Sequence, residues 1–356
     1  MNEKIREIYN QILQRLALVD FDKIWKGFHQ CKFALYTDEV VYFADTTIPK
    51  DSRFVGNTAL LYNDEYIAIW NIQQTINDDL DMIASLMVHE MFHVFQNIEQ
   101  EKRFPYDLKM LNYPETMENL SLKRYENQIL CQAFCADDLE EKRKLLKEFM
   151  AVRKYRQTII GDIILQEYCT ETIEGIAEYA GSMALKQLSP EKYNEKIKTF
   201  VQYLTTINQD FFDIRRMLYY SGTLFCIALT EAGEQINHKI KGCEQTLFEM
   251  ISKDIEVKAV LAAKKSDPEL KKIVQQHNEE KEQTFADFLQ QHTNKVTGTF
   301  QICGYDPMNM VKLRNMLLCT HFLMLKRAEE KPMFLQGPLI AVLQEGTVDR
   351  VCEYIL

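Results

Sequence analysis

The chain has 356 residues, of which 46% are hydrophobic and 26% charged, the profile of a soluble globular protein. Its 52 acidic and 42 basic residues give a formal net charge of −10. Nucleic-acid-binding proteins usually carry a basic patch or tail, and because none stands out here we expect no nucleic-acid partner. No apolar run reaches the roughly 18 residues that a membrane span needs, so we expect no membrane partner either.

Residues 1–30 have the pattern of amphipathic helices and contain no uninterrupted apolar region followed by a small-residue cleavage site. We therefore expect no secretory signal and a cytoplasmic protein. The nine cysteines are an odd number, and in a chain without an export signal they are expected to be reduced thiols. Cys131 and Cys135, four residues apart, could share a metal or a disulfide, but packing in the core explains them more simply.

The main strand-forming region of the N-terminal half extends from residue 32 to residue 71. Three runs within it are rich in β-branched and aromatic residues, at residues 40–43, 54–62 and 66–70. A turn signal at residues 63–65 separates the last two runs, which predicts a hairpin. Together these runs predict a small N-terminal β-sheet.

From residue 72 to residue 292 the apolar residues recur with the period of an α-helix. Acidic Asp78, Asp79 and Asp81 favour the start of the first helix in this region. Further helices are expected at residues 114–155, 160–187, 191–206, 208–232, 244–264 and 267–292.

The sequence pattern changes at residue 295, after which alternating apolar segments are separated by Gly, Pro and charged clusters. This pattern predicts a small strand-rich module. The predicted fold class is therefore α+β and predominantly helical. We expect one domain at residues 1–294, with strands near 32–71 and helices over 72–292, and a C-terminal module at residues 295–356.

The sequence HEMFH at residues 89–93 carries the strongest chemical signal. Histidines four residues apart lie on one helix face, so His89 and His93 can bind the same metal ion. Glu90 can then reach the attacking water as a general base. The alternative is a pair of core histidines. Because burial of two imidazoles and a carboxylate in the apolar segment 82–95 costs several kcal/mol without partners, a cation is favoured.

A catalytic zinc ion needs three protein ligands and one open position. No third histidine follows within residues 94–103, so a downstream glutamate is the candidate. Spacings of four, three and four place four glutamates on one face of a helix near residues 163–184: Glu167, Glu171, Glu174 and Glu178. A solvated acidic stripe is the alternative. Gly175 and Gly181 would let another backbone approach closely.

The motif at residues 89–93 and the segment EGIAEY at residues 174–179 resemble the gluzincin metallopeptidases, the family that includes thermolysin and the aminopeptidase N relatives. The resemblance implies a zincin-like catalytic domain, one Zn²⁺ per chain and Glu174 as the third ligand. It also implies that Glu178 steadies the first histidine. Glu171 is the alternative ligand.

The chain departs from this family in two respects. The separation of 81 positions between His93 and Glu174 is longer than the family's spacer, and an inserted helical hairpin near residues 105–155 would account for it. The Gly-x-Met-Glu-Asn signature of the aminopeptidase N relatives is missing, so the resemblance assigns no aminopeptidase specificity.

The segment LYYSGTL at residues 218–224 resembles the Tyr-x-x-Gly segment of the aminopeptidase N relatives. The resemblance implies that Tyr219, or Tyr220 next to it, donates a hydrogen bond to the oxyanion. Packing in the core is the alternative for both. Arg215 and Arg216 could bind a substrate carboxylate, although arginines at such positions are more commonly exposed side chains.

These observations predict a zinc-dependent metallopeptidase that hydrolyses a peptide or protein substrate, with Glu90 as general base. The strand at residues 66–70 could pair with an extended substrate, as peptide-binding edge strands do. Two alternatives stay open: a non-peptidase zinc amidohydrolase, and a zincin-like binding scaffold that has lost turnover. The intact Glu90 argues against the scaffold, because a binding protein needs no base.

Overall fold

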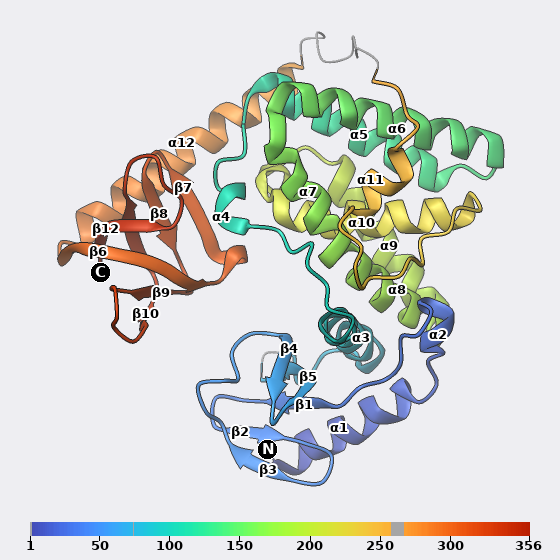
Figure 1. Ribbon diagram of the computed structural model, residues 1–356, viewed down its shortest axis with the longest axis horizontal. Helices are drawn as coiled ribbons and strands as arrows, with labels where there is room; N and C mark the ends of the chain where they lie inside the picture. The colour runs from blue at the N-terminus through green and yellow to red at the C-terminus, as the bar shows by residue number, and fades with distance from the viewer. Residues whose placement is uncertain (1, 74, 258–266) are drawn as a thin grey trace.

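The computed structural model describes residues 2–73, 75–257 and 267–356. Figure 1 shows an N-terminal sheet flanked by helices, a large helical region, and a C-terminal sheet reached through one long helix. The prediction of an α+β, predominantly helical fold is confirmed.

The N-terminal sheet has five strands in the order β3-β2-β1-β5-β4. Its strands are β1 (Phe33–Tyr36), β2 (Val40–Tyr42), β3 (Thr47–Pro49), β4 (Thr58–Tyr62) and β5 (Glu65–Asn71). Strands β1 and β5 are parallel, and every other neighbouring pair is antiparallel. The expected hairpin is present as β4 and β5, although residues 54–57 lie outside the strand predicted there.

The prediction that the strand at residues 66–70 pairs with an extended substrate is wrong. Residues 66–70 lie in β5, which is hydrogen-bonded to β1 on one side and to β4 on the other. No backbone groups are therefore left along β5 for a further strand. The edge strand next to β5 is β4, and it lies against helix α3 (Leu80–Ile98).

Helix α3 is the central element of the structure. Its N-cap is Asp79, whose side chain accepts hydrogen bonds from the backbone N–H groups of Asp81 and Met82. The acidic residues of this segment predicted that the helix starts here. One side of α3 contacts β4 and β5, and the other contacts α8 (Ile176–Leu188). The two preceding helices are α1 (Asn2–Leu16) and α2 (Phe21–Ile24).

The helical region contains more breaks than the sequence predicted. The helical hairpin expected near residues 105–155 is present as α5 (Met117–Cys135) and α6 (Leu139–Ile160), which pack against each other and account for the long separation between His93 and Glu174. The other elements are α4 (Asp107–Met110), α9 (Pro190–Thr205), η3 (Gln209–Phe212), α10 (Ile214–Glu231) and α11 (Leu247–Ser252). Residues 258–264 of the helix expected at 244–264 lie outside the described residues.

The helix expected at residues 160–187 is interrupted by a π-helical turn. It consists of η1 (Gly161–Ile163), α7 (Ile164–Thr170), the π-turn η2 (Glu171–Gly175) and α8. A π-turn inserts one residue, which rotates the following residues by about 100° relative to a continuous α-helix. The four glutamates are accordingly divided between two sets of partners, and all are buried or nearly so, which excludes the solvated acidic stripe.

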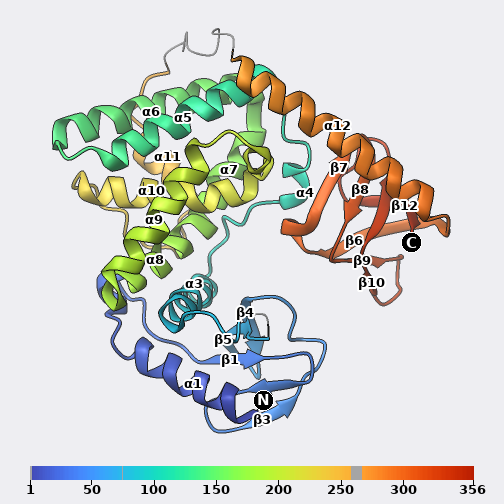
Figure 2. The ribbon, with the colours of Figure 1, turned by 180° about the vertical axis from the view of Figure 1, so that it is seen from behind.

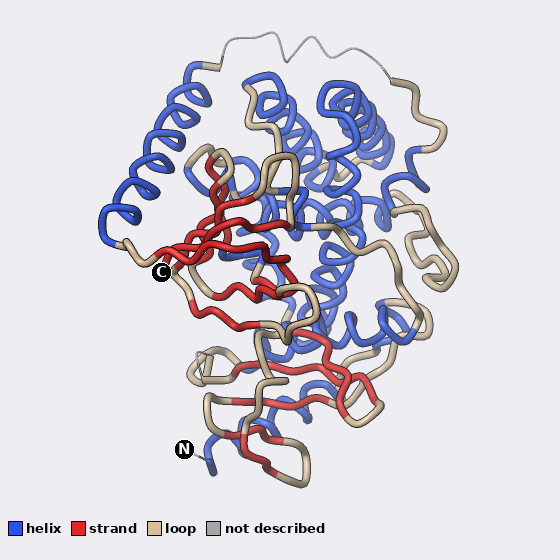
Figure 3. The backbone as a smooth tube through the Cα atoms, turned by 60° about the vertical axis from the view of Figure 1, so that its left-hand side comes forward, coloured by secondary structure: helices blue, strands red, loops and turns tan. Residues whose placement is uncertain are grey.

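The C-terminal region consists of α12 (Pro268–Gln291) and a seven-stranded antiparallel sheet in the order β10-β9-β6-β12-β11-β8-β7. Figures 2 and 3 show α12 descending from the helical region and lying along this sheet. The elements are β6 (Lys295–Tyr305), η5 (Pro307–Asn309), β7 (Met310–Leu313), β8 (Met316–Cys319), β9 (Phe322–Lys326), β10 (Met333–Gln336), β11 (Leu339–Leu343) and β12 (Arg350–Ile355).

The strand-rich character predicted for residues 295–356 is present in this sheet. Among the described residues, no helix is both long enough and apolar enough to cross a membrane. All nine cysteines are free thiols, and Cys131 packs in the core of the helical region.

Candidate metal centre

The two histidines of α3 point their Nε2 atoms at each other. These atoms lie 3.0 Å apart, and the two rings are nearly perpendicular. His89 is buried and His93 is nearly so. The i, i+4 spacing therefore brings both imidazoles to one point, as a shared metal ion requires.

Glu174 is the carboxylate that meets the histidines. Its Oε2 atom lies 3.1 Å from Nε2 of His93 and 3.6 Å from Nε2 of His89. A tetrahedral zinc ion with bonds of ordinary length separates its ligand atoms by about 3.3 Å. The three distances within this group, hereafter the His–Glu cluster (His89, His93 and Glu174), bracket that value. The cluster has the donor chemistry and the dimensions of a zinc site.

The second ring nitrogen of each histidine is also held. His89 Nδ1 lies 3.1 Å from a carboxylate oxygen of Glu178, and His93 Nδ1 lies 2.7 Å from the amide oxygen of Gln96. Because both partners are acceptors, each Nδ1 carries a proton, and Nε2 is the ring nitrogen that each histidine directs into the cluster. Two unprotonated nitrogens 3.0 Å apart repel each other unless a cation or a proton lies between them.

Close helix packing brings Glu178 to its histidine. A Cβ atom on Gly181 would lie 2.6 Å from the carbonyl oxygen of Ser85, so only glycine allows α8 to approach α3 this closely. Glu178 also forms an ion pair with Lys196 of α9, whose Nζ lies 2.7 Å from Oε1 of Glu178. Glu178 is thereby fixed between Lys196 and His89.

The ionisation of the cluster follows from these contacts. Burial alone would lower the pKa of His89, but hydrogen bonds to Glu174 and Glu178 outweigh it and raise that pKa to about 10. The pKa of Glu174 lies well below its usual range, because His93, His89 and Arg215 outweigh burial. These shifts favour a proton between the ligand atoms when no metal is bound, and a metal ion would replace it.

Glu90 lies beside the cluster without belonging to it. A carboxylate oxygen of Glu90 and one nitrogen each of His89 and His93 lie within 4.8 Å of one another. Burial raises the pKa of Glu90 above its usual value, and the two histidines only partly offset this effect. A carboxyl group with a raised pKa next to a metal position is suited to accept and return a proton.

The two tyrosines of α10 have different surroundings. The ring of Tyr219 is parallel to that of His89, at a centroid distance of 5.9 Å. Burial and the proximity of Glu174 raise the pKa of Tyr219 well above its usual range, so its hydroxyl remains a donor. Tyr220 instead stacks on Phe200, with ring centroids 4.1 Å apart. The structure thus brings Tyr219, and not Tyr220, against the cluster.

The two arginines expected to meet a substrate carboxylate are engaged within the chain. Arg215 donates to Asp107 through Nη1 and to Oε1 of Glu174, 3.1 Å away, through Nη2. Arg216 is paired with Asp213 and is half exposed. Arg215 is therefore ion-paired with Asp107 and Glu174, and substrate binding by either arginine stays a prediction.

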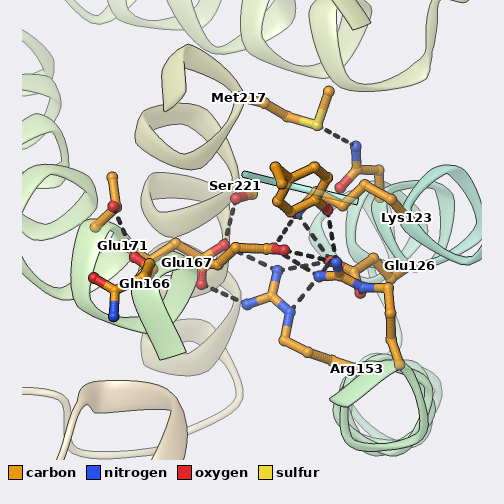
Figure 4. Close-up of polar contacts among 12 residues, drawn as sticks. Lys123, Glu126, Arg153, Gln166, Glu167, Glu171, Met217 and Ser221 are labelled. Carbon is orange, nitrogen blue, oxygen red and sulfur yellow. Dashed lines mark hydrogen bonds and ion pairs between the residues drawn. The ribbon is translucent and has the colours of Figure 1, made fainter. Parts of the chain in front are cut away.

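Glu171, the alternative ligand, faces away from the histidines. It accepts hydrogen bonds from Arg153 and from the hydroxyl of Ser221. Figure 4 shows it in a compact group with charged side chains of α5, α6 and α7. This buried charge network contains three cations and three carboxylates: Lys123, Glu126, Arg153, Arg156, Glu167 and Glu171. The equal numbers make the network neutral, which satisfies Glu171 without a metal.

Two cavities adjoin the cluster. One of about 170 Å³ is lined by His93, Glu174 and Arg215 and by Thr58 and Ala59 of the edge strand β4. A larger one of about 890 Å³ lies between α3, α9 and α10, and Tyr219 and Glu178 form part of its wall. Its apolar lining includes Trp70, Met82, Leu86, Phe200 and Met308.

Several residues around the cluster were missed in the sequence. Gln96 could have been found, because it is a polar residue three positions after His93 in an apolar segment. Nothing in the sequence pointed to Lys196 or Asp107. Their partners, Glu178 and Arg215, are more than 15 positions away and contact them only in the folded chain.

Comparisons of the chain with protein-family models, with curated proteins and with solved structures find no match. The functional assignment therefore depends on the geometry of the His–Glu cluster and its surroundings.

Proposed function

We propose that this chain is a zinc-dependent metallopeptidase with a zincin-like catalytic domain. One observation carries the proposal: three ligand atoms of His89, His93 and Glu174 converge at separations of 3.0, 3.1 and 3.6 Å. Both histidines also have their second nitrogen fixed by an acceptor. This combination fits a zinc ion with a fourth position left for water.

The roles of the chain's own residues follow from their positions. A bound zinc ion would supply Lewis acidity that polarises the scissile carbonyl and activates a water molecule. Glu90 accepts the proton of the attacking water and delivers it to the leaving amine. Tyr219 donates a hydrogen bond to the negative charge that develops on the carbonyl oxygen. Glu178 and Gln96 keep the two imidazoles oriented throughout.

A peptide is the substrate that the surroundings of the cluster suit best. The edge strand β4 has one side unpaired within the described sheet, and it lines the cavity at His93. An extended peptide can add to such an edge through main-chain hydrogen bonds. The larger cavity beyond Tyr219, whose wall combines apolar and charged side chains, then offers space for a bulky side chain of the substrate.

The first test is metal content measured by elemental analysis on protein purified without added metal. We expect one zinc ion per chain in the wild type and a loss of zinc in His93→Ala and Glu174→Gln. Glu171→Gln removes a carboxylate of the same π-turn that faces the charge network: it should lower the free energy of unfolding, but the folded protein should retain zinc.

The second test is hydrolysis of a peptide library, with Glu90→Gln as the variant that binds zinc but lacks the base. We expect this variant to lose at least about 100-fold in rate. A wild type that neither contains zinc nor takes it up on titration would overturn the proposal. A zinc-bound wild type that cleaves no peptide but hydrolyses small amides would point to the amidohydrolase instead, and one inactive on both would point to the binding scaffold.

A further inference from the structure

The short helix α4 is part of the chain segment between α3 and α5, but it packs against the C-terminal sheet. Its residue Leu108 is only 2% exposed and packs in the core of the C-terminal sheet. The partners of Leu108 in that core include Phe300, Leu317 and Leu323. The C-terminal sheet therefore holds α4 through a buried apolar contact.

The residue next to this contact leads directly to the third ligand. Asp107 accepts a hydrogen bond from Nη1 of Arg215, and Nη2 of the same guanidinium donates to Oε1 of Glu174. The other oxygen of Glu174 faces the histidines. Because a guanidinium is planar, fixing one of its terminal nitrogens fixes the direction of the other.

Arg215 has little freedom apart from these two bonds. Its side chain is 16% exposed, and its Cζ atom lies 5.9 Å from the centroid of the Tyr219 ring. Asp107 is thus the residue that neutralises and orients Arg215 from the side opposite the cluster. Without it, Arg215 would be free to turn toward Glu174 with both nitrogens and compete with a metal ion for the carboxylate.

We propose that Asp107 is a positioning residue of the metal centre, and that docking of the C-terminal sheet on Leu108 sets its position. On this view the sheet is a structural part of the site. The inference rests on the proposed function, because it concerns the zinc ligand Glu174. It goes beyond that proposal by assigning a role to a region that contributes no ligand.

The experiment measures zinc affinity by competition with a chromogenic chelator, on the full chain. Asp107→Ala should weaken zinc binding by about 10-fold to 100-fold, as loss of a partner of a ligand does. Asp107→Glu should restore part of that loss. Asp306→Ala is the control: Asp306 has a similar exposure, 21% against 18%, but pairs with His321 and not with Arg215.

Two further measurements separate positioning from loss of folding. The visible spectrum of the cobalt(II)-loaded protein reports ligand geometry, and it should change in Asp107→Ala but not in Asp306→Ala. In a double-mutant cycle, the effects of Asp107→Ala and Arg215→Ala on zinc affinity should be non-additive, because the two residues act as one unit.

The role of the sheet is tested by Leu108→Ala against Leu317→Ala. Both remove the same atoms from the same core, so both should lower the unfolding midpoint, but only Leu108→Ala should weaken zinc binding. Equal zinc affinities in these two variants would overturn the role of docking. Wild-type affinity and an unchanged spectrum in Asp107→Ala would overturn the role of Asp107 and leave the zinc site standing. A wild type that binds no zinc would overturn both the inference and the proposed function.

Discussion

Gly175 and Gly222 lie in direct backbone contact. A Cβ atom on Gly175 would stand 2.7 Å from Cα of Gly222, and one on Gly222 would stand 2.8 Å from Cα of Gly175. The contact joins the π-turn η2 to α10 immediately after Glu174. The close approach predicted for Gly175 is therefore present, and its partner is a second glycine.

This contact predicts the effect of Gly222→Ala. The added methyl group must push η2 and α10 apart, which we expect to cost about 1–3 kcal/mol of unfolding free energy. Because Glu174 moves with η2, zinc affinity should fall as well. Urea unfolding and zinc competition measure the two effects. Thr230→Ala, an exposed change on the same helix, is the control, and an unaltered zinc affinity in Gly222→Ala would contradict the coupling.

The different surroundings of the two tyrosines predict different kinetics for their phenylalanine variants. Tyr219→Phe removes the hydroxyl next to the cluster and should lower kcat by about 100-fold, with a smaller change in KM. Tyr220→Phe leaves the stacking on Phe200 in place and should remain close to the wild type. Steady-state kinetics on a cleaved peptide distinguish the two. A kcat of Tyr219→Phe close to that of the wild type would show that its hydroxyl does not act on the oxyanion.

Removal of one member of the buried charge network should be strongly destabilising. Arg153 is fully buried and pairs with Glu126 and Glu171. Arg153→Met leaves an excess negative charge in the interior, which we expect to cost about 3–5 kcal/mol. Arg143→Met, on the exposed face of the same helix, should cost less than about 1 kcal/mol. Chemical unfolding of the two variants measures the difference, and similar losses would rule out a special cost at Arg153.

The same network predicts a loss of stability in acid. Burial would raise the pKa of Glu126, but Arg156, Lys123 and Arg153 outweigh it and lower the pKa from 4.5 to about 2. Since the folded-state pKa lies below the unfolded one, the carboxylate stabilises the fold above about pH 4.5, and this contribution is lost as the pH falls toward 2.

Unfolding of the metal-free protein by urea between about pH 5 and about pH 3 tests this prediction. The free energy of unfolding should fall steeply in the wild type and less steeply in Glu126→Gln, which has no carboxyl to protonate. Asp51→Asn is the control: Arg53 also lowers the pKa of Asp51 to about 2, but that carboxyl is half exposed, so solvent screening should leave its curve close to that of the wild type. Parallel curves for the wild type and Glu126→Gln would contradict the assignment.

The sequence predicted those parts of the structure that depend on local spacing. The i, i+4 histidines fall on one face wherever α3 is helical, so their convergence needs no knowledge of the fold. The acidic start of α3 and the hairpin of β4 and β5 are likewise local. The close proximity of Glu174 to the histidines was predicted from the family resemblance, because the 81 intervening positions carry no local signal.

The parts that could not be predicted depend on long-range contacts. A regular helical period hides the π-turn at Glu171, because the turn adds one residue without changing the composition. The spacing of the glutamates therefore suggested one face, whereas Glu171 is satisfied by Arg153 of another helix. The order of strands could not be predicted from the sequence either. Alternation of apolar residues identifies β5 as a strand, but it does not reveal that β1 pairs with β5 and leaves β4 at the edge.

The packing of α4 against the C-terminal sheet has a consequence for folding during synthesis. The ribosome releases α3, α4 and Glu174 well before the strands that bury Leu108, and domains fold as their residues emerge. Under the proposed linkage, a nascent chain carries every zinc ligand while Asp107 still lacks its support. Under the two proposals together, full zinc affinity comes only with the last strands, so an unfinished chain would bind zinc more weakly than the complete protein.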